Sequence, residues 1–501
     1  MKPGVFGVLG TLVGGSLLGG CLVGPDYVRP APATTPPAFK EMRSQPTATA
    51  ALPGVPIPGE WRPASPQDMA DRGAWWSIYN DPLLYSLVSQ VEVSNQTLKS
   101  AEAAYRQSRA LIRENRSALY PTVSASGGPT QIGTGQSRSS SGGSSGNATQ
   151  FAGTGSLSWE IDIWGGIRRT IENASAAAQA SAGDLAAARL SIQAEVITNY
   201  FSLRVADESR RLFEASVTAY QRSLQIVQNQ VNAGIASNLD LAQARTLVQQ
   251  TQAQVVAATL QRTLFEHAIA ALVGKAPAEL TIAPSKLTET VPFLDAGIPS
   301  TLLERRPDIA AAERQMAAAN AQIGVAVAAY YPNLTLSGSL GFLSSTIGAL
   351  FAVGNSVWSL GPQLAGTVID GGARGGAVDS ARAAYDAAVA NYRQTVLTAF
   401  QDVEDQLANQ RILTQQEVVQ LQAVASAREA VQLSLNQYLA GTVPYTTVVV
   451  TQTTALSNEQ SALTVRLNRL AASANLIKAL GGGWNTTQLP APEPIAGLTQ
   501  R

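Results

Sequence analysis

Histidine and cysteine are almost absent from this 501-residue chain, which contains one of each. A zinc cluster of Cys and His, a Ser-His-Asp triad or a Cys-His pair could therefore be built only around His267. This residue falls inside an expected helix, where we interpret it as a packing or lumen-facing side chain. The Gly-rich run at 371–376 lacks the Lys-Ser/Thr of a phosphate-binding loop. We therefore expect no enzymatic activity, no metal and no cofactor.

Charged and aromatic side chains are also scarce. Only 14% of residues are charged and 6% are aromatic, and 35 basic residues balance 35 acidic ones. Because there is no basic field, we expect no nucleic-acid partner. Beyond the N-terminal segment the chain has no apolar run long enough for a transmembrane helix. The abundance of Ala, Gln, Ser and Gly is typical of long helices that pack closely through small side chains.

The N-terminus has the composition of an export signal. Lys2 precedes an apolar run at 5–18, which is too short and too rich in glycine to span a bilayer as a helix. We interpret residues 1–20 as a lipoprotein signal peptide, because Leu-Gly-Gly-Cys at 18–21 resembles a bacterial lipobox. Cys21 would then carry the covalent lipid, with acyl chains such as palmitate. The alternative is an ordinary signal peptide with an incidental cysteine.

The segment that follows, 21–72, is rich in proline. Proline lacks a backbone N–H and fixes φ, so we expect an extended strap rather than a helix. This strap would join the lipid on Cys21 to the body of the protein.

Beyond the strap, two stretches of the chain carry the same marks in the same order. The shared marks are Ala-Glu at 101–102 and 312–313, Tyr-Pro at 120–121 and 331–332, and Ala-Gly at 233–234 and 440–441. We infer one structure with two repeats. The predicted parts are a first repeat at 73–274, a linker at 275–299, a second repeat at 300–482 and a tail at 483–501. Each repeat should run helix, strand, loop, strand, long helix, turn, helix.

Alternation of polar and apolar residues predicts four strands, at about 121–132, 150–163, 332–343 and 356–369. Their length and period are typical of outer-membrane strands, which face lipid on one side and water on the other. A soluble sandwich with one wet face is the alternative. Strand parity places Glu160 and Asp162 on the water side, so we expect them to line a barrel lumen and to favour cations.

Four strands cannot close a barrel, and open strand edges are not tolerated in hydrocarbon. We therefore expect several chains to share one barrel. The proline-free stretches at 166–231 and 373–439 predict two helices of about 100 Å each. Gly234 and Gly441 are natural C-caps, after which the chain should return as helices at 240–273 and 445–480.

The chain resembles the TolC-like outer-membrane efflux factors, most closely their lipoprotein (NodT-type) branch. The resemblance covers nearly the whole mature chain. The sequence motifs that carry it are Gly-Pro-Asp-Tyr at 24–27, Trp-Trp at 75–76, Asp-Pro-Leu at 81–83, Leu-Glu-Arg-Arg-Pro-Asp-Ile at 303–309, Trp-Ser-Leu-Gly-Pro at 358–362, Asp-Gly-Gly at 370–372 and Ala-Phe-Gln-Asp-Val-Glu-Asp at 399–405.

This resemblance implies a fold of α-helices with membrane β-strands. A homotrimer would form a 12-stranded β-barrel, continued in the periplasm by a long α-helical barrel. The implied function is the outer-membrane exit duct of a tripartite efflux system. Its implied partners are a periplasmic adaptor, or membrane fusion protein, and an inner-membrane pump of the RND type.

In the family, the periplasmic helical turns draw together as a gate held by ionic and hydrogen-bonding pairs. Asp240 and Tyr438 match that pattern here. Val450 and Thr453 stand where Asp and Arg are frequent, and Thr446 stands where Leu is common. The resemblance therefore leaves an ion pair at the gate open, and we expect packing and hydrogen bonds instead. Asp240 also has a simpler interpretation, because Ser-x-x-Asp at 237–240 predicts a capped helix start.

Two other classes of function are the alternatives. A non-channel periplasmic adaptor, or a structural helical-hairpin lipoprotein, would also be exported and rich in hairpins, but it would lack the paired membrane strands. An exported enzyme has no nucleophile and base to place in one cleft. The cargo stays open among drugs, metal ions and aromatic acids.

Overall fold

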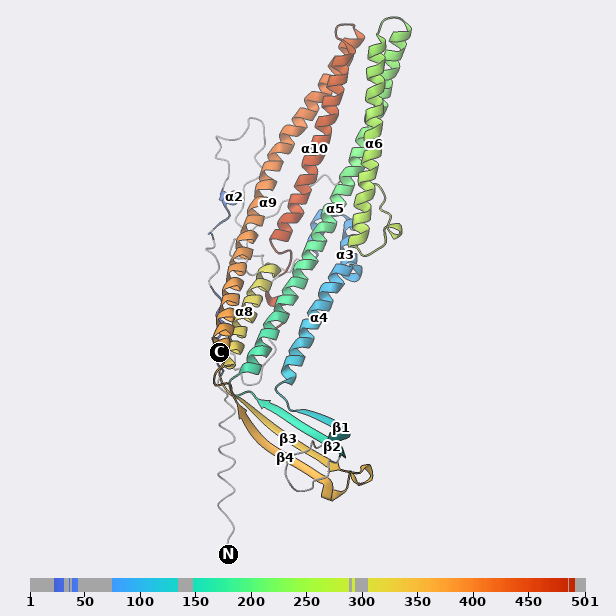
Figure 1. Ribbon diagram of the computed structural model, residues 1–501. Coiled ribbons are helices and arrows are strands. Elements are labelled where there is room, and N and C mark those ends of the chain that lie inside the picture. The colour runs from blue at the N-terminus through green and yellow to red at the C-terminus, as the bar shows by residue number, and fades with distance from the viewer. Residues whose placement is uncertain are drawn as a thin grey trace.

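The computed structural model describes residues 22–30, 36, 38–43, 74–133, 147–287, 291–292, 305–484 and 486–491. A four-stranded sheet lies at one end of the molecule, and two long helical hairpins reach away from it to the other end (Figure 1). The predicted signal peptide and Cys21 lie outside the described residues.

The sheet contains β1 (Thr122–Gly133), β2 (Asn147–Ile161), β3 (Asn333–Ser344) and β4 (Ser356–Ala365). The strands are antiparallel and lie in the order in which they occur in the sequence. The prediction of four strands is confirmed. The predicted ends at 163 and 369 were too late, since β2 ends at Ile161 and β4 at Ala365. Asp162 and Asp370 instead cap the helices that follow. Each carboxylate accepts hydrogen bonds from two backbone N–H groups of the next turn.

The helices occur as repeat-related pairs of equal length. The pairs are α4 (Gln96–Ser117) with α8 (Pro307–Ala328), α5 (Gly166–Asn232) with α9 (Ala373–Leu439), and α6 (Asn238–Leu272) with α10 (Tyr445–Ala479). Gly165 and Gly372, both left-handed, lead into the two long helices with φ of 82° and 93°. The 67 residues of α5 and α9 correspond to about 100 Å. The predicted order of elements is therefore present in both halves.

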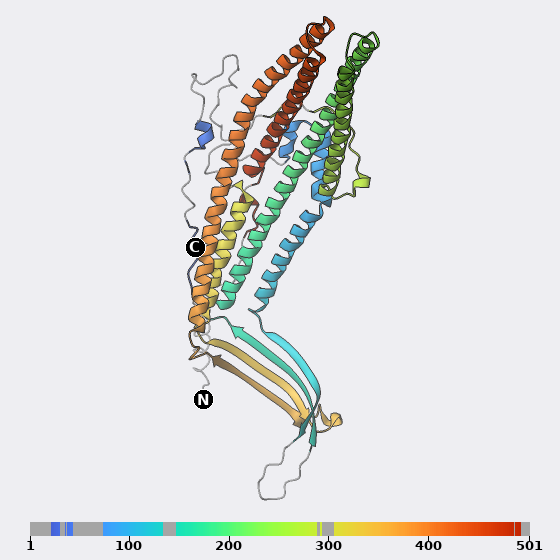
Figure 2. The same cartoon turned by 45° about the horizontal axis from the view of Figure 1, so that its top comes forward.

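Beyond the sheet, α4, α5, α8 and α9 lie side by side in one layer (Figures 1 and 2). In this layer α5 contacts α4 and α8, and α8 contacts α9. Farther out, α6 returns along α5, and α10 returns along α9. Among the helices of the described residues, none is long and apolar enough to cross a membrane.

Shorter elements lie beside the helices, namely α2 (Lys40–Arg43), η1 (Trp75–Tyr79), α3 (Pro82–Ser94), η2 (Pro277–Glu279) and η6 (Thr486–Gln488). Two more, η4 (Ile347–Ala349) and η5 (Val353–Asn355), lie in the loop between β3 and β4 at the tip of the sheet. The largest hydrophobic core joins η1 and α3 to the parts of α5 and α9 on the side of the sheet, through side chains such as Tyr79, Phe201 and Tyr392. Asp81 caps α3 and also accepts a hydrogen bond from the Tyr200 hydroxyl, which fixes α3 on α5.

Part of the predicted strap is described, and it lies along α8 and α9. The Tyr27 hydroxyl donates to Glu313 at 2.5 Å, and the amide of Asn320 donates to the carbonyl of Pro25 at 3.0 Å. The expectation that the strap contains no helix is wrong at α2. No proline occurs between positions 38 and 45, and the Glu404 carboxylate accepts from the N–H groups of Lys40 and Glu41.

Candidate functional site: the two sheet faces and the hairpin ends

One face of the sheet is covered with small hydroxyl side chains. Across β1 and β2 the register pairs Thr122 with Ser158 and Ser124 with Ser156. The same face continues over β3 and β4, where the hydroxyls of Ser339 and Ser359 lie 2.8 Å apart. Such side chains hydrogen-bond to water and leave room above the sheet. This face is therefore suited to contact with water.

The opposite face is apolar. It contains Leu336, Leu340 and Phe342 of β3, and Trp358, Leu360 and Leu364 of β4. Trp358, Leu360 and Leu364 are 75%, 68% and 66% exposed in the single chain. Large apolar side chains exposed side by side mark contact with lipid or with another protein. The alternation predicted from the sequence is thus present as two chemically different faces.

Glu160 is the one charged residue in the four strands. It is exposed and lies opposite Thr335 on the hydroxyl face, as strand parity predicted. Asp162 is different, and its predicted place in a lumen is wrong. The strand ends at Ile161, and the Asp162 carboxylate, 10% exposed, caps α5 and pairs with Arg168 at 3.1 Å.

Aromatic side chains gather where the sheet meets the helices. Trp164 stacks on Tyr331 with 4.6 Å between ring centroids and donates to the carbonyl of Pro332. Trp159 donates to the carbonyl of Leu119, and Tyr120 is 65% exposed. Tyr and Trp in a belt at one end of membrane strands are typical of a membrane–water interface. Tyr120 and Tyr331 of this cluster belong to the Tyr-Pro marks of the two repeats, so these marks were the available signal for it.

At the far ends of the hairpins, Asp240 forms the predicted cap. The Ser237 hydroxyl accepts from the Asp240 N–H at 3.1 Å, and the Asp240 carboxylate accepts from the Ser237 N–H at 3.1 Å. This reciprocal capping box satisfies backbone donors at the start of α6. The capping interpretation of Asp240 is confirmed.

Tyr438 lies between the two hairpins, in an apolar cluster with Val227, Leu241 and Val448. It meets the ring of Tyr445 edge-on with 5.2 Å between ring centroids, and it is 8% exposed. Its hydroxyl has no hydrogen-bond partner among the described residues. Burial, together with the negative charge of Asp240, raises the pKa of Tyr438, and burial raises the pKa of Tyr445 to about 12. Both rings therefore stay neutral and act through packing.

Thr446, Val450 and Thr453 lie on the exposed side of α10, away from this cluster. Steps of four and three residues keep them on one helix face. Val450 is 61% exposed, and the Thr453 hydroxyl donates to the carbonyls of Val449 and Val450 within its own helix. The structure thus brings Asp240 near Tyr438 and leaves the three other predicted gate residues free of the contact between hairpins.

That contact uses residues that the sequence did not single out. The Tyr220 hydroxyl of α5 donates to the carbonyl of Gln452 of α10 at 3.0 Å, and the Gln452 amide donates to Ser223 at 3.2 Å. Gln452 is 4% exposed, and its position among apolar neighbours on α10 was the available signal. The first hairpin therefore meets the second through hydrogen bonds and apolar packing.

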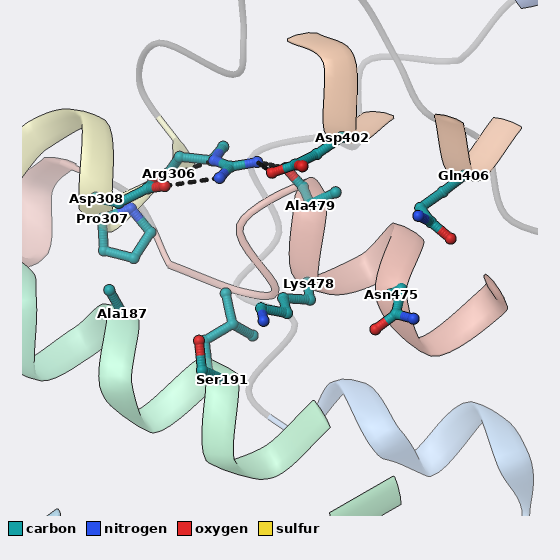
Figure 3. A pocket seen from close by; sticks show the side chains of 11 residues that line it. Ala187, Ser191, Arg306, Pro307, Asp308, Asp402, Gln406, Asn475, Lys478 and Ala479 are labelled. Carbon is teal, nitrogen blue, oxygen red and sulfur yellow. Dashed lines mark hydrogen bonds and ion pairs between the residues drawn. The ribbon is translucent and has the colours of Figure 1, made fainter. Parts of the chain in front are cut away.

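A pocket of about 180 Å³ lies where α8 begins and α10 ends (Figure 3). Arg306 dominates one side and donates to Asp308 at 2.6 Å, to Asp402 at 3.1 Å and to the carbonyl of Ala479 at 3.1 Å. One side chain thus joins the start of α8, the middle of α9 and the end of α10. The Arg-Arg-Pro-Asp block that carries part of the family resemblance therefore has a structural role.

Comparison with known proteins identifies this architecture. The family model described as outer membrane efflux protein matches residues 87–275 and 298–482. The toluene efflux pump outer membrane protein TtgC of Pseudomonas putida is 32% identical over 443 residues, which cover 86% of this chain and 91% of that protein. The pyoverdine export outer membrane protein OpmQ of Pseudomonas aeruginosa is 32% identical over 440 residues, 86% of this chain and 92% of that protein.

Solved structures agree with this result. The outer-membrane channel OprN superposes with a TM-score of 0.81 at 28% identity, covering 93% of this chain and all of that one. The CmeC outer membrane channel of Campylobacter jejuni superposes with a TM-score of 0.83 at 24% identity, which shows the fold, over 93% of this chain and 96% of that one.

The chain belongs to the outer membrane efflux protein family. It is an outer-membrane efflux component, as the sequence resemblance implied.

Proposed function

We propose that this protein is the exit duct of a tripartite efflux system, through which cargo passes the outer membrane without chemistry. The two-faced sheet carries this proposal. An apolar face suits lipid, and a hydroxyl face suits a water-filled path. In the described residues β1 pairs only with β2, and β4 pairs only with β3, so both sheet edges are available to other chains.

Three copies would close the sheet. Twelve strands satisfy the backbone groups that four strands leave open in hydrocarbon. In such a homotrimer β4 of one chain pairs with β1 of the next, and the helical layers continue the barrel as a tunnel. The lipid on Cys21 anchors each chain, and the strap along α8 and α9 holds the anchor close to the tunnel wall.

The partners follow from this architecture. An inner-membrane pump, proposed to be of the RND type, supplies the energy, and a periplasmic adaptor joins the pump to the hairpin ends. Relatives are described as toluene and pyoverdine exporters, and the pump rather than the duct would choose among such cargoes. The gate between the hairpins is held by packing and hydrogen bonds around Tyr438 and Gln452.

The protein mass of the membrane-extracted species in detergent, corrected for bound detergent, tests the proposal. Three copies per particle together with stepwise conductance in a planar bilayer are expected. A stable monomer would mean that the four strands do not form a shared barrel, and the duct would have to be abandoned.

Glu160 provides a second test. Three copies would place a ring of three carboxylates in a path otherwise lined by Ser and Thr, which favours cations. Glu160→Gln is expected to move the reversal potential in a salt gradient toward that of a neutral pore. Asp162→Asn is a matched control, because Asp162 faces Arg168 rather than the path. If wild type and Glu160→Gln have the same ion selectivity, Glu160 does not face the lumen.

A further inference from the structure

The repeat-related helices α4 and α8 occupy different positions in the helical layer. α8 packs between α5 and α9, whereas α5 is the one long helix of this layer that α4 contacts. α4 and α9 therefore form the two edges of the layer (Figure 1). Thirteen residues of α8 are buried but only two of α4, so the described part of the chain leaves most of the α4 surface exposed.

The exposed surface of α4 is basic. The helix contains five basic residues, Lys99, Arg106, Arg109, Arg113 and Arg116, against Glu102 and Glu114. Arg106 and Arg113 are exposed and seven residues apart, so they lie on the same side of the helix. Neither makes a hydrogen bond or an ion pair with the described part of the chain.

The packing of α5 on α8 shows how such an arginine is held. The aliphatic part of Arg169 lies against Gly324, where an added Cβ would be 2.8 Å from the Arg169 side chain. The guanidinium then pairs with Glu172, one turn along α5, at 2.8 Å, and also with Asp26 of the strap at 2.9 Å; the side chain is 1% exposed. A glycine on one helix thus receives an arginine from the other, and an acid completes the contact.

The same three parts occur on α4 and α9, with the glycine and the arginine exchanged. Counted from the N-caps Gly165 and Gly372, Arg169 corresponds to Gly376, and Glu172 corresponds to Asp379. Counted from the Tyr-Pro marks at 120–121 and 331–332, Gly324 corresponds to Arg113.

The α9 positions are open in the single chain. A Cβ added at Gly376 would meet nothing within 4 Å. The Asp379 side chain is 79% exposed, and its nearest base is Arg382 at 3.8 Å. Space for an arginine and a carboxylate to receive it are therefore both present on this edge of the layer.

We infer that α4 packs on α9 of a second copy as α8 packs on α5, with Arg113 lying over Gly376 and pairing with Asp379. The inference rests on the proposed trimer, and it names the helical contact between its chains. Arg106 and Asp386, each seven residues farther from the sheet, form a second pair at the next level. Opposite charges on the two edges and the packing of α5 on α8 both favour a second copy as the occupant.

Cysteine cross-linking tests this contact directly. Arg113→Cys combined with Gly376→Cys is expected to give covalent trimers on a non-reducing gel, while either single variant gives none. The protein mass in detergent is measured on the same samples. Trimers by mass without a cross-link would overturn the contact and leave the duct intact. If the wild-type protein is a monomer by mass, both the contact and the duct are contradicted.

Charge exchange provides a readout that does not depend on new cysteines. Arg113→Asp is expected to lower the temperature of trimer dissociation, because it places two acids side by side, and Asp379→Arg in the same chain is expected to restore it. Arg222→Asp, at an exposed position of α5, is the matched control. If each substitution lowers the dissociation temperature and the two decreases simply add in the double variant, the pairing of Arg113 with Asp379 is contradicted. The same holds if Arg113→Asp weakens binding to vesicles of anionic phospholipid and leaves the trimer unchanged, since a lipid surface would then be the partner.

Discussion

The two hairpins have helices of equal length, yet their outer halves are held together differently. Phe213, Leu247 and Val248 pack α5 on α6 in an apolar cluster that also takes in Leu456 of α10. One buried ion pair, between Asp207 and Arg262, also joins α5 to α6. The ion pairs that join α9 to α10, between Glu417 and Arg469 and between Glu459 and Arg428, are more exposed. Charge screening does not weaken apolar burial, whereas it does weaken partly exposed ion pairs. We therefore expect the first hairpin to be the firmer wall at high salt, and the second to be the one that salt loosens.

The largest effect is expected in the apolar cluster. Phe213 is 4% exposed, and Phe213→Ala should destabilise the first hairpin by about 3 to 5 kcal/mol, because it leaves a cavity. Thermal unfolding followed by circular dichroism measures the loss. Leu421→Ala, at a 54% exposed position of α9, should change little. Equal decreases in stability for Phe213→Ala and Leu421→Ala would mean that the apolar cluster does not stabilise the first hairpin.

The next effect concerns the joint between the hairpins. Gln452→Leu removes the hydrogen bond to Ser223 and keeps the volume, and such a bond contributes about 1 kcal/mol. We expect the closed-state conductance to rise several-fold in a planar bilayer. Gln249→Leu, on the exposed side of α6, is the control. An unchanged conductance would place the gate elsewhere.

A smaller effect is expected from the ion pairs of the second hairpin. Arg428 is 67% exposed, so its pair with Glu459 should contribute less than about 1 kcal/mol. Raising NaCl to about 1 M shortens the Debye length to about 3 Å and should speed amide exchange in α9 and α10 more than in α5 and α6. Arg428→Gln should reduce this salt dependence. Uniform acceleration in both hairpins would remove the distinction between them.

The smallest effect is expected at Tyr438. Its hydroxyl makes no hydrogen bond with the described residues, so Tyr438→Phe should leave both stability and conductance within error. Asp240→Ala should instead cost about 1 kcal/mol through loss of the cap. A leaky Tyr438→Phe channel would show that the hydroxyl has a partner in the assembled protein.

Sequence patterns predicted regular structure well, because period and punctuation are local. Alternation along the strands and the absence of proline from α5 and α9 located these elements within a few residues. Parity failed at Asp162, since a carboxylate beside a Gly-Gly turn is recruited by the free N–H groups of the next helix. The alternation of polar and apolar residues does not show whether such a carboxylate faces the lumen or caps the next helix.

Contacts between distant segments could not be read from local patterns. Arg306 meets partners 96 and 173 residues away, and Gln452 meets Ser223 across two hairpins. The resemblance likewise pointed to a gate at Asp240 and Tyr438, whereas the three α10 residues predicted with them lie on the exposed side of that helix. Such sites depend on how helices pack, which small and repetitive side chains leave unspecified.

The 67 residues of α9 form one helix with no proline, from Gly372 at the sheet to the turn at Gly441. A rod of this kind acts as a lever whose pivot lies beside the membrane. With a length of about 100 Å, a tilt of about 3° at its base moves the far end by about 5 Å. A wide aperture can therefore open and close while each contact near the pivot shifts by only a fraction of an ångström.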